Sequence, residues 1–395
     1  MSVRPLTGVI RPYAWGSRSV LAALQGRPVP SEGPEAELWL GAHPGDPSTV
    51  TGPDGPISLA TVIAEDPEGQ LGPEVAGEFG ARLPYLMKVL AAESPLSLQA
   101  HPDADYARKA FAAQEADKDA PRNYTDAFHK PEMLVALTPF EALCGFRDPG
   151  VSADVLTELV VPSLAPVITA LRRGPEGLGE AVRTLLSWPA EDRPALVEAV
   201  ARAAAGKPDS RYAESLALAT NLASRYPGDP GVLVALLLNH VHLAPGEAIW
   251  MPAGNLHAYL HGAGVEIMAA SDNVLRGGFT PKRVDVGELL RVLRFEVLRD
   301  PILPATELAP GVLTWRVPAR EFVLYRIRLD GTRPPTVVPA AGPRLILGVE
   351  GDVFVAQDHG TPTEVSAGTA AFATADAGPI TVAGVGEVFV AGVPA

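Results

Sequence analysis

GEAIWMPAGNLH, residues 246–257, combines turn-forming residues with a single histidine. Gly246 stands at its start, Pro252 and Gly254 mark a second turn, and His257 follows. Glycine adopts turn conformations that other residues resist, and proline restricts one backbone dihedral angle. The segment is therefore predicted to form a strand, a tight turn and a second strand. That geometry would direct His257, at the start of the second strand, into the interior of a β-barrel.

The spacing inside this segment is specific. Five residues separate Gly246 from Pro252, one separates Pro252 from Gly254, and two separate Gly254 from His257. This pattern resembles the second motif of the cupin superfamily. A metal ion bound by His257 would need further ligands, because zinc usually binds three or more protein groups.

Candidate ligands lie upstream of this motif. In SLQAH, Gln99 and His101 are expected on one face of a strand, since alternate residues share a side. Glu132 follows Pro131, which restricts the backbone where the next strand begins. Two imidazoles, a carboxylate and an amide oxygen suit a borderline metal such as zinc.

The first 150 residues are rich in turns. Short apolar runs such as Leu83–Leu90 and Met133–Leu137 lie between glycines and prolines, which favours strands over helices. One helix is predicted to interrupt these strands. It would be capped by Asp103 and would extend to about Glu115.

A different pattern begins near residue 151. Up to about residue 230, leucine and valine recur at helical spacing, and prolines interrupt stretches rich in Ala, Leu, Glu and Arg. We predict four to six short helices there. After residue 240 the strands return, as in the alternating run Tyr325–Leu329 before an Asp-Gly turn. A helical block between β-rich segments indicates an insertion into a β-domain rather than a βαβ alternation.

Composition limits the classes of function. Of the 395 residues, 47% are hydrophobic and 20% charged, which is typical of a globular chain of two or three domains. A net charge of −14 disfavours nucleic acid or an anionic membrane as the main partner. The single cysteine, Cys144, fits a reducing compartment. Residues 1–16 lack the apolar core of a signal peptide, and we expect a cytoplasmic location.

Seven blocks, taken together, resemble the type I mannose-6-phosphate isomerases (phosphomannose isomerases), which are zinc enzymes of the cupin superfamily. They occur in the order of that family, between about residues 12 and 295. The blocks are PYAWGS, ELWLGAHP, LPYLMKVL, LSLQAHPD, HKPEM, CGFRD and VEIMAASDNVLRGGFTPKRVD. The helical block and the last 95 residues match the family only in their pattern of expected helices and strands and in their position along the chain.

The resemblance implies a mainly β fold with a helical insertion. A catalytic cupin jelly-roll barrel would comprise residues 1–150 and 231–300, with an inserted helical domain at 151–230. A C-terminal jelly roll without metal would follow at 301–395. The segment SAGTAAFATADAG, residues 366–378, supports the last expectation because it contains no histidine.

The resemblance also implies one Zn²⁺ per chain, bound by Gln99, His101, Glu132 and His257. The activity it implies is the interconversion of mannose 6-phosphate and fructose 6-phosphate. That reaction moves one proton between C1 and C2 through an enediol. It therefore requires ring opening, a proton carrier and stabilisation of the enediolate oxygens.

Several charged residues are candidates for these tasks. Arg276, flanked by glycines that allow close approach of a ligand, corresponds to an active-site arginine of the family. Glu266 and Asp272 follow the His257 motif. The proton carrier is predicted to be Glu266 or Lys130, with His129 assisting ring opening.

Lys88, Ser97 and Lys282 are the candidates for binding the phosphate, which favours cationic partners. Four other histidines are interpreted as structural or supporting residues: His43, His240, His242 and His261. Of these, His261 is a candidate to orient His257.

The sequence is less consistent with two other functions. A metal-dependent cupin oxygenase would need a closely spaced histidine pair with a nearby glutamate, unlike Gln99 and Glu132. A non-catalytic sugar-binding cupin is disfavoured by the charged residues Glu266, Asp272, Arg276 and Lys282. The expected partner is a small sugar phosphate, with no nucleic acid or membrane, and the chain is expected to be a monomer.

Overall fold

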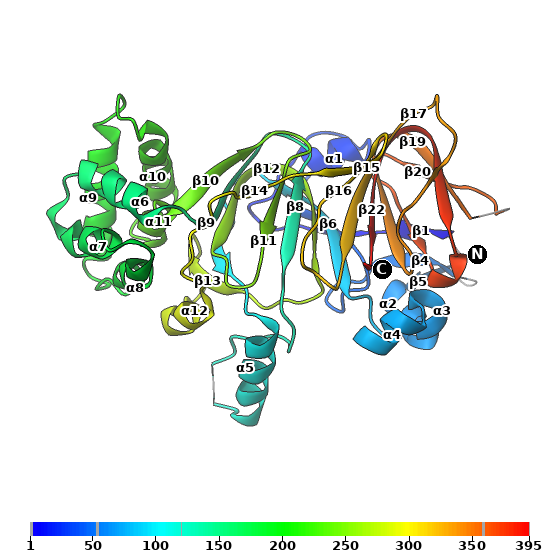
Figure 1. Ribbon diagram of the computed structural model, residues 1–395, viewed down its shortest axis with the longest axis horizontal. Helices are drawn as coiled ribbons and strands as arrows, with labels where there is room; N and C mark the ends of the chain where they lie inside the picture. Colours follow the sequence, from blue (N-terminus) through cyan, green and yellow to red (C-terminus); the bar gives the residue numbers. More distant parts are fainter. Residues whose placement is uncertain (1–2, 53–54, 120, 358–359, 395) are drawn as a thin grey trace.

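The computed structural model describes residues 3–52, 55–119, 121–357 and 360–394. Three parts stand in a row in Figure 1, with a helical block at one end and two β-regions beside it. Strands dominate the chain outside the helical block. The predicted mainly β fold with a helical insertion is therefore confirmed.

The middle part is a barrel of two sheets joined by one long strand. One sheet has the order β14-β11-β8-β12-β6-β3-β2, and the other connects β10, β9, β12, β7 and β13. Its strands are β2 (Val9–Arg11), β3 (Glu37–Leu40), β6 (Tyr85–Ala92), β7 (Leu98–Ala100), β8 (Glu132–Ala136), β9 (Phe140–Phe146), β10 (Leu238–Leu243), β11 (Ala248–Met251), β12 (His257–Ala269), β13 (Leu275–Gly278) and β14 (Ile302–Leu303).

Strand β12 serves both sheets because its register shifts between Tyr259 and His261. Its first residues pair with β7 and β9, whereas its second half pairs with β6 and β8. Such a shift bends a strand and re-aims its side chains. As predicted, Pro252 and Gly254 form the turn between β11 and β12, and Gly254 has φ +77°, a value that favours glycine.

The C-terminal part contains a separate sheet with the order β15-β16-β17-β22-β19-β21-β1-β4-β5. Its strands are β1 (Val3–Thr7), β4 (Thr49–Gly52), β5 (Gly55–Ser58), β15 (Thr306–Ala309), β16 (Val312–Thr314), β17 (Val323–Asp330), β18 (Thr336–Val337), β19 (Arg344–Gln357), β20 (Thr363–Ser366), β21 (Ala370–Ala373) and β22 (Ile380–Gly392). Three strands from the first 58 residues thus belong to this sheet: β1 pairs with β21, β4 pairs with β1, and β5 pairs with β4. The C-terminal sheet therefore takes its strands from both ends of the chain, and no single cut in the sequence separates the two β-regions.

The helical block packs on the far end of the barrel through a shared apolar core. Its helices are α6 (Pro149–Glu158), α7 (Ala165–Leu171), α8 (Leu178–Leu186), α9 (Arg193–Ala205), α10 (Ala213–Arg225) and α11 (Gly231–Ala235). In α8, Leu178, Val182, Leu185 and Leu186 are buried at helical spacing, which orients the helix toward the barrel. The predicted helical character of this segment is confirmed.

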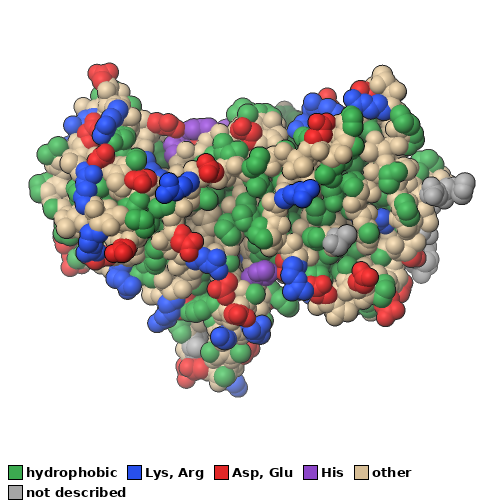
Figure 2. Space-filling view, viewed as in Figure 1, with side chains coloured by type: hydrophobic (Ala, Val, Ile, Leu, Met, Phe, Trp, Pro, Cys, Tyr) green, Lys and Arg blue, Asp and Glu red, His purple; other side chains and the backbone are tan. Residues whose placement is uncertain are grey.

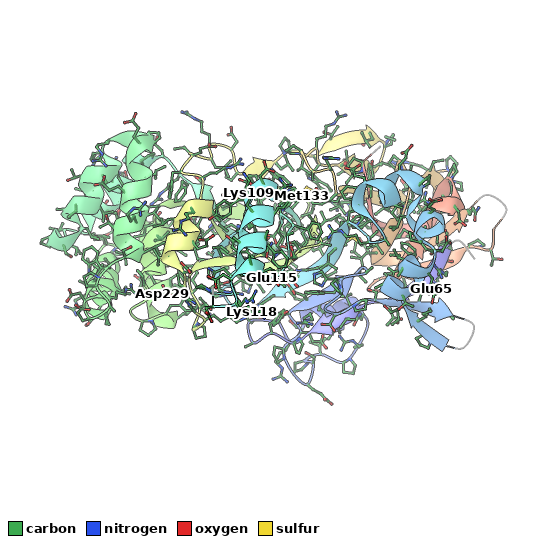
Figure 3. All side chains as sticks on the ribbon, turned by 90° about the horizontal axis from the view of Figure 1, so that it is seen from below. Glu65, Lys109, Glu115, Lys118, Met133 and Asp229 are labelled. Carbon is green, nitrogen blue, oxygen red and sulfur yellow. The ribbon has the colours of Figure 1, made fainter. Side chains whose placement is uncertain are left out.

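The remaining helices lie around the β-regions. They are α1 (Val20–Leu24), α2 (Leu59–Glu65), α3 (Pro67–Leu71), α4 (Pro73–Phe79), α5 (Ala104–Ala116) and α12 (Val286–Val292), with short 3₁₀ turns at Pro162–Leu164, Gly174–Gly177 and Ala375–Ala377. The side chain of Asp103 accepts a hydrogen bond from the Tyr106 amide and caps α5 as predicted. Helix α5, which carries Lys109 and Glu115, projects below the barrel (Figures 1 and 3).

Within the described part of the chain, we find no helix with the length and apolar character needed to span a bilayer.

The barrel and the C-terminal part share a second apolar core. Tyr85 and Val265 of the barrel belong to the same buried cluster as Leu345, Phe372 and Phe389 of the C-terminal sheet. The two β-regions are thus packed together over apolar side chains rather than joined by a linker alone.

Candidate metal centre

Three side chains from distant parts of the sequence meet inside the barrel. Nε2 of His101 and Nε2 of His257 each lie 3.2 Å from Oε2 of Glu132. All three side chains are almost fully buried. Their candidate ligand atoms lie within 4.8 Å of one another, and they form one of two such groups among the described His, Cys, Asp and Glu residues.

Hydrogen bonds to the backbone decide which nitrogen of each ring is free. Nδ1 of His101 lies 2.7 Å from the carbonyl oxygen of Asn273, and Nδ1 of His257 lies 3.1 Å from that of Asn255. A carbonyl only accepts, so each Nδ1 carries the proton. In a neutral ring the lone pair is then on Nε2. Burial lowers the pKa of His101 to about 4, which favours that neutral form.

Two nitrogen lone pairs therefore face one carboxylate oxygen, an arrangement that is repulsive without a cation between them. Nε2 of His257 has no hydrogen-bond partner among the described residues, although it is buried. Zinc binds nitrogen and oxygen at about 2.0–2.1 Å, which places neighbouring tetrahedral ligands about 3.3 Å apart. The observed separations of 3.2 Å match that spacing, so these residues fit zinc.

Gln99 is placed beside this centre by strand pairing. Its Cα is the register partner of His257 on β12 and of Arg276 on β13. Directly paired residues of antiparallel strands have their side chains on the same face. Gln99, His257 and Arg276 therefore share one face of three adjacent strands, with strand spacings of about 4.8 Å.

Lys130 completes the surroundings of Glu132. Its Nζ lies 2.8 Å from Oε1 of Glu132, the oxygen that does not face the histidines. Burial would raise the pKa of Glu132, but the Lys130 ammonium opposes burial, and the pKa of Glu132 lies well below its ordinary value. Glu132 is therefore ionised and able to bind a cation.

A second buried cluster lies on the neighbouring strands. Nζ of Lys88 is 3.4 Å from Oε1 of Glu37 and 3.4 Å from Oε2 of Glu266. Tyr259 donates a hydrogen bond of 2.8 Å to Glu266, and Trp39 donates one of 2.7 Å to Glu37. Every polar group in this cluster thus has a partner, and the cluster forms a buried charge network.

The charges of this network shift one another's pKa values. Burial disfavours the Lys88 ammonium, yet Glu37 and Glu266 outweigh burial and raise the pKa of Lys88. Burial raises the pKa of Glu266, with Lys88 opposing it and Glu132 adding to it. A carboxyl with a raised pKa is suited to exchange a proton near neutral pH.

Arg276 differs from these residues because its charge has no partner. The side chain is half-buried and has no ion pair or hydrogen bond with any described residue. Burial alone lowers the pKa of its guanidinium. A partly desolvated, uncompensated arginine is suited to receive an anionic group.

The other predicted site residues are more dispersed. Asp272 is exposed and lies 3.4 Å from Nε2 of His43. Ser97 precedes β7 and is half-buried, whereas Lys282 is exposed in the segment after β13. His129 lies 2.7 Å from Oε1 of Glu321 in the C-terminal part, so its ring is not among the groups that face Glu132.

The placement of Lys88 bears on its predicted phosphate contact. Only 5% of Lys88 is exposed, and both nearby carboxylates already compensate its charge. A phosphate dianion at this point would meet Glu37 and Glu266. The structure therefore favours a supporting role for Lys88 beside Glu266.

Reasoning from sequence missed two residues of the network, Glu37 and Tyr259. Glu37 had a detectable signal, since a carboxylate inside an apolar strand needs a buried partner. The suggestion that His261 orients His257 is wrong, because the Asn255 carbonyl accepts from His257 and His261 is exposed. The register shift before His261 turns that side chain outward.

A β-barrel with a buried His, Glu, His centre defines a metal-binding protein of the cupin class. Residues 3–149 match the family described as phosphomannose isomerase type I, catalytic domain. The chain is 36% identical over 398 residues to mannose-6-phosphate isomerase of Escherichia coli K12, covering 98% of each. It is 34% identical over 362 residues to mannose-6-phosphate isomerase of Rattus norvegicus, covering 84% of this chain and 83% of that protein.

The same relationship appears among solved structures. A crystal structure of zinc-bound mannose 6-phosphate isomerase has a TM-score of 0.89 and 32% identity, covering 100% of both chains. The chain belongs to the mannose-6-phosphate isomerase family.

Proposed function

We propose that this protein is a zinc-dependent aldose-ketose isomerase that interconverts mannose 6-phosphate and fructose 6-phosphate. The observation that carries the proposal is the buried centre of His101, Glu132 and His257, with an uncompensated arginine on an adjacent strand. Relatives named for this activity share nearly the full length of the chain.

The metal would be held by His101, Glu132 and His257, with the amide oxygen of Gln99 as the fourth ligand. Bound zinc supplies Lewis acidity toward the oxygens at C1 and C2. The backbone carbonyls that accept from each Nδ1 fix the ring orientations in advance.

Glu266 is proposed to carry the proton between C1 and C2. Its raised pKa brings the carboxyl closer to neutral pH, where an efficient proton carrier should titrate. The Tyr259 hydroxyl and the Lys88 ammonium hold the two carboxylate oxygens in place. Lys130 is proposed to act as a cation beside the enediolate, because Glu132 fixes its Nζ next to the metal ligands.

Arg276 is proposed to neutralise negative charge on the substrate. Its guanidinium faces the same side of the sheet as Gln99 and has no carboxylate partner among the described residues. Ser97 precedes β7 and Lys282 follows β13, so both lie at the same end of this antiparallel pair, and they are proposed to bind the phosphate. Asp272 and His129 are proposed to assist the reaction from the edge of the site.

We further propose that the protein is monomeric and located in the cytoplasm. A single, fully buried cysteine fits a reducing compartment. Size-exclusion chromatography with light scattering measures the first property, and fractionation of cells that express the protein measures the second.

The test of the function is a coupled assay that detects fructose 6-phosphate formed from mannose 6-phosphate. The protein is assayed as isolated, after removal of metal by a chelator, and after zinc is restored. Activity that disappears with the chelator and returns with zinc supports the proposal. A fully zinc-loaded protein without turnover contradicts it and favours a sugar-binding cupin.

A further inference from the structure

A second group of histidine and glutamate side chains lies at the junction of the helical block and the barrel. Glu214 on α10 meets His240 and His242 on β10, and their candidate ligand atoms lie within 4.8 Å of one another. Histidine side chains, purple in Figure 2, are visible in the hollow between these two parts. The three residues belong to neither the metal centre nor the Lys88 network.

The hydrogen bonding of the two ring nitrogens of His240 indicates what this group binds. Its Nε2 lies 2.7 Å from Oε1 of Glu141, a carboxylate that accepts the proton of that nitrogen. In the neutral ring, the lone pair is then on Nδ1. That atom is buried and has no hydrogen-bond partner among the described residues, and the side chain is only 10% exposed.

The free nitrogen of His240 faces a carboxylate. Nδ1 lies 3.3 Å from Oε1 of Glu214, and Nε2 of His242 lies 2.6 Å from the same oxygen. A lone pair opposite an anionic oxygen is unfavourable unless a proton or a metal ion lies between them. The 3.3 Å separation between His240 and Glu214 equals the distance expected between two ligands of one tetrahedral ion, about 3.3 Å, whereas the 2.6 Å contact of His242 is a hydrogen bond that a bound ion would replace.

The second histidine favours a metal ion over a proton. A proton on Nδ1 would satisfy His240 and Glu214 without any need for His242. Instead, two imidazoles converge on one carboxylate, and Glu141 holds His240 from behind, as carboxylates hold metal-binding histidines. The adjoining groove of about 300 Å³ is lined by Glu93, Glu141 and Glu214 against a single guanidinium, which favours a cation.

We propose that Glu214, His240 and His242 form a second site for a borderline divalent transition-metal ion, with zinc as the first candidate. Two nitrogen donors and one carboxylate oxygen suit this class of ion, and water from the open groove completes the coordination. Because the ligands come from α10 and β10, the bound ion links the helical block to the barrel. The site is separate from catalysis and does not depend on the proposed activity.

The experiment is a zinc titration of the holoenzyme that already contains its catalytic zinc. Calorimetry and elemental analysis after gel filtration are expected to give a second equivalent per wild-type chain. His242→Gln and Glu214→Gln each remove one ligand and are expected to weaken that second binding at least tenfold. Glu141→Ala, which releases His240 from its carboxylate, is expected to weaken it about tenfold as well.

Glu198→Gln is the matched control, because Glu198 is an exposed glutamate on α9 whose one ion pair among the described residues is with Arg202. It is expected to leave the second equivalent unchanged. Circular dichroism and retention of the first zinc confirm that each variant is folded. A wild-type holoenzyme that binds no second zinc overturns the proposal, as does second binding of equal strength in His242→Gln and Glu214→Gln. NMR that shows His240 doubly protonated at neutral pH, with no zinc uptake, overturns it in favour of an imidazolium.

Discussion

Replacement of Glu266 by glutamine tests the central chemical proposal, because the substitution removes the exchangeable proton while preserving shape. The glutamine oxygen still accepts the hydrogen bond that Tyr259 donates at 2.8 Å. Lys88 keeps its contact with Glu37 at 3.4 Å. We therefore expect a folded, zinc-loaded protein whose kcat falls by about 10²–10⁴-fold, the contribution of one proton carrier. That range corresponds to about 3–5.5 kcal/mol of activation free energy.

The matched control is Glu37→Gln. Glu37 lies at the same 3.4 Å distance from Lys88 as Glu266, so both substitutions remove one negative charge from the same ammonium. Only Glu266 is proposed to exchange the substrate proton. We expect Glu37→Gln to lower kcat by less than about tenfold, which isolates proton transfer from the electrostatic change.

Both variants are compared by steady-state kinetics with mannose 6-phosphate, after zinc content and circular dichroism have been matched to the wild type. The pH profile provides an independent signature. Burial raises the pKa of Glu266, so the wild-type rate should fall with decreasing pH at higher pH than for an ordinary glutamate, and this limb should be absent from Glu266→Gln. Equal kcat values for the two variants, or an unchanged acid limb, would refute the proton-carrier role.

Three further substitutions test the rest of the site. His257→Ala should lose bound zinc and activity together, as measured by elemental analysis and the coupled assay, and full zinc retention would exclude His257 as a ligand. Arg276→Ala should lower kcat by at least about tenfold with zinc retained, since the guanidinium is proposed to stabilise developing charge; a change confined to KM would make it a uniform binding residue. Lys88→Met should reduce the free energy of unfolding by about 3–5 kcal/mol, because it leaves Glu37 and Glu266 buried without a cation, and an unchanged denaturation midpoint would contradict this.

Local features of the fold were predictable from the sequence because short-range physics controls them. The turn at Pro252 and Gly254 and the cap at Asp103 depend on backbone preferences of a few residues. Alternating and helical periodicities separated the strands from the helical block for the same reason. The identities of the candidate zinc ligands rest on motif spacing and family resemblance, and the structure brings His101, Glu132 and His257 together.

Long-range pairing was not predictable in this way. Strands β1, β4 and β5 join the C-terminal sheet, and no local pattern in the first 58 residues indicates which distant edge they complete. Strand register also decides which neighbour each side chain meets. It pairs Lys88 with Glu266 and places Arg276 beside Gln99.

By itself, the sequence determined the mainly β class, the helical insertion and the residue types available for zinc and proton chemistry. Only the tertiary structure decided how adjacent residues divide their roles: Lys130 contacts Glu132, whereas His129 reaches Glu321 of the C-terminal part. Neighbours on an extended chain point to opposite sides, so their partners depend on which elements pack on each side. The same reason explains His240 and His242, whose shared contact with Glu214 exists only because α10 packs beside β10.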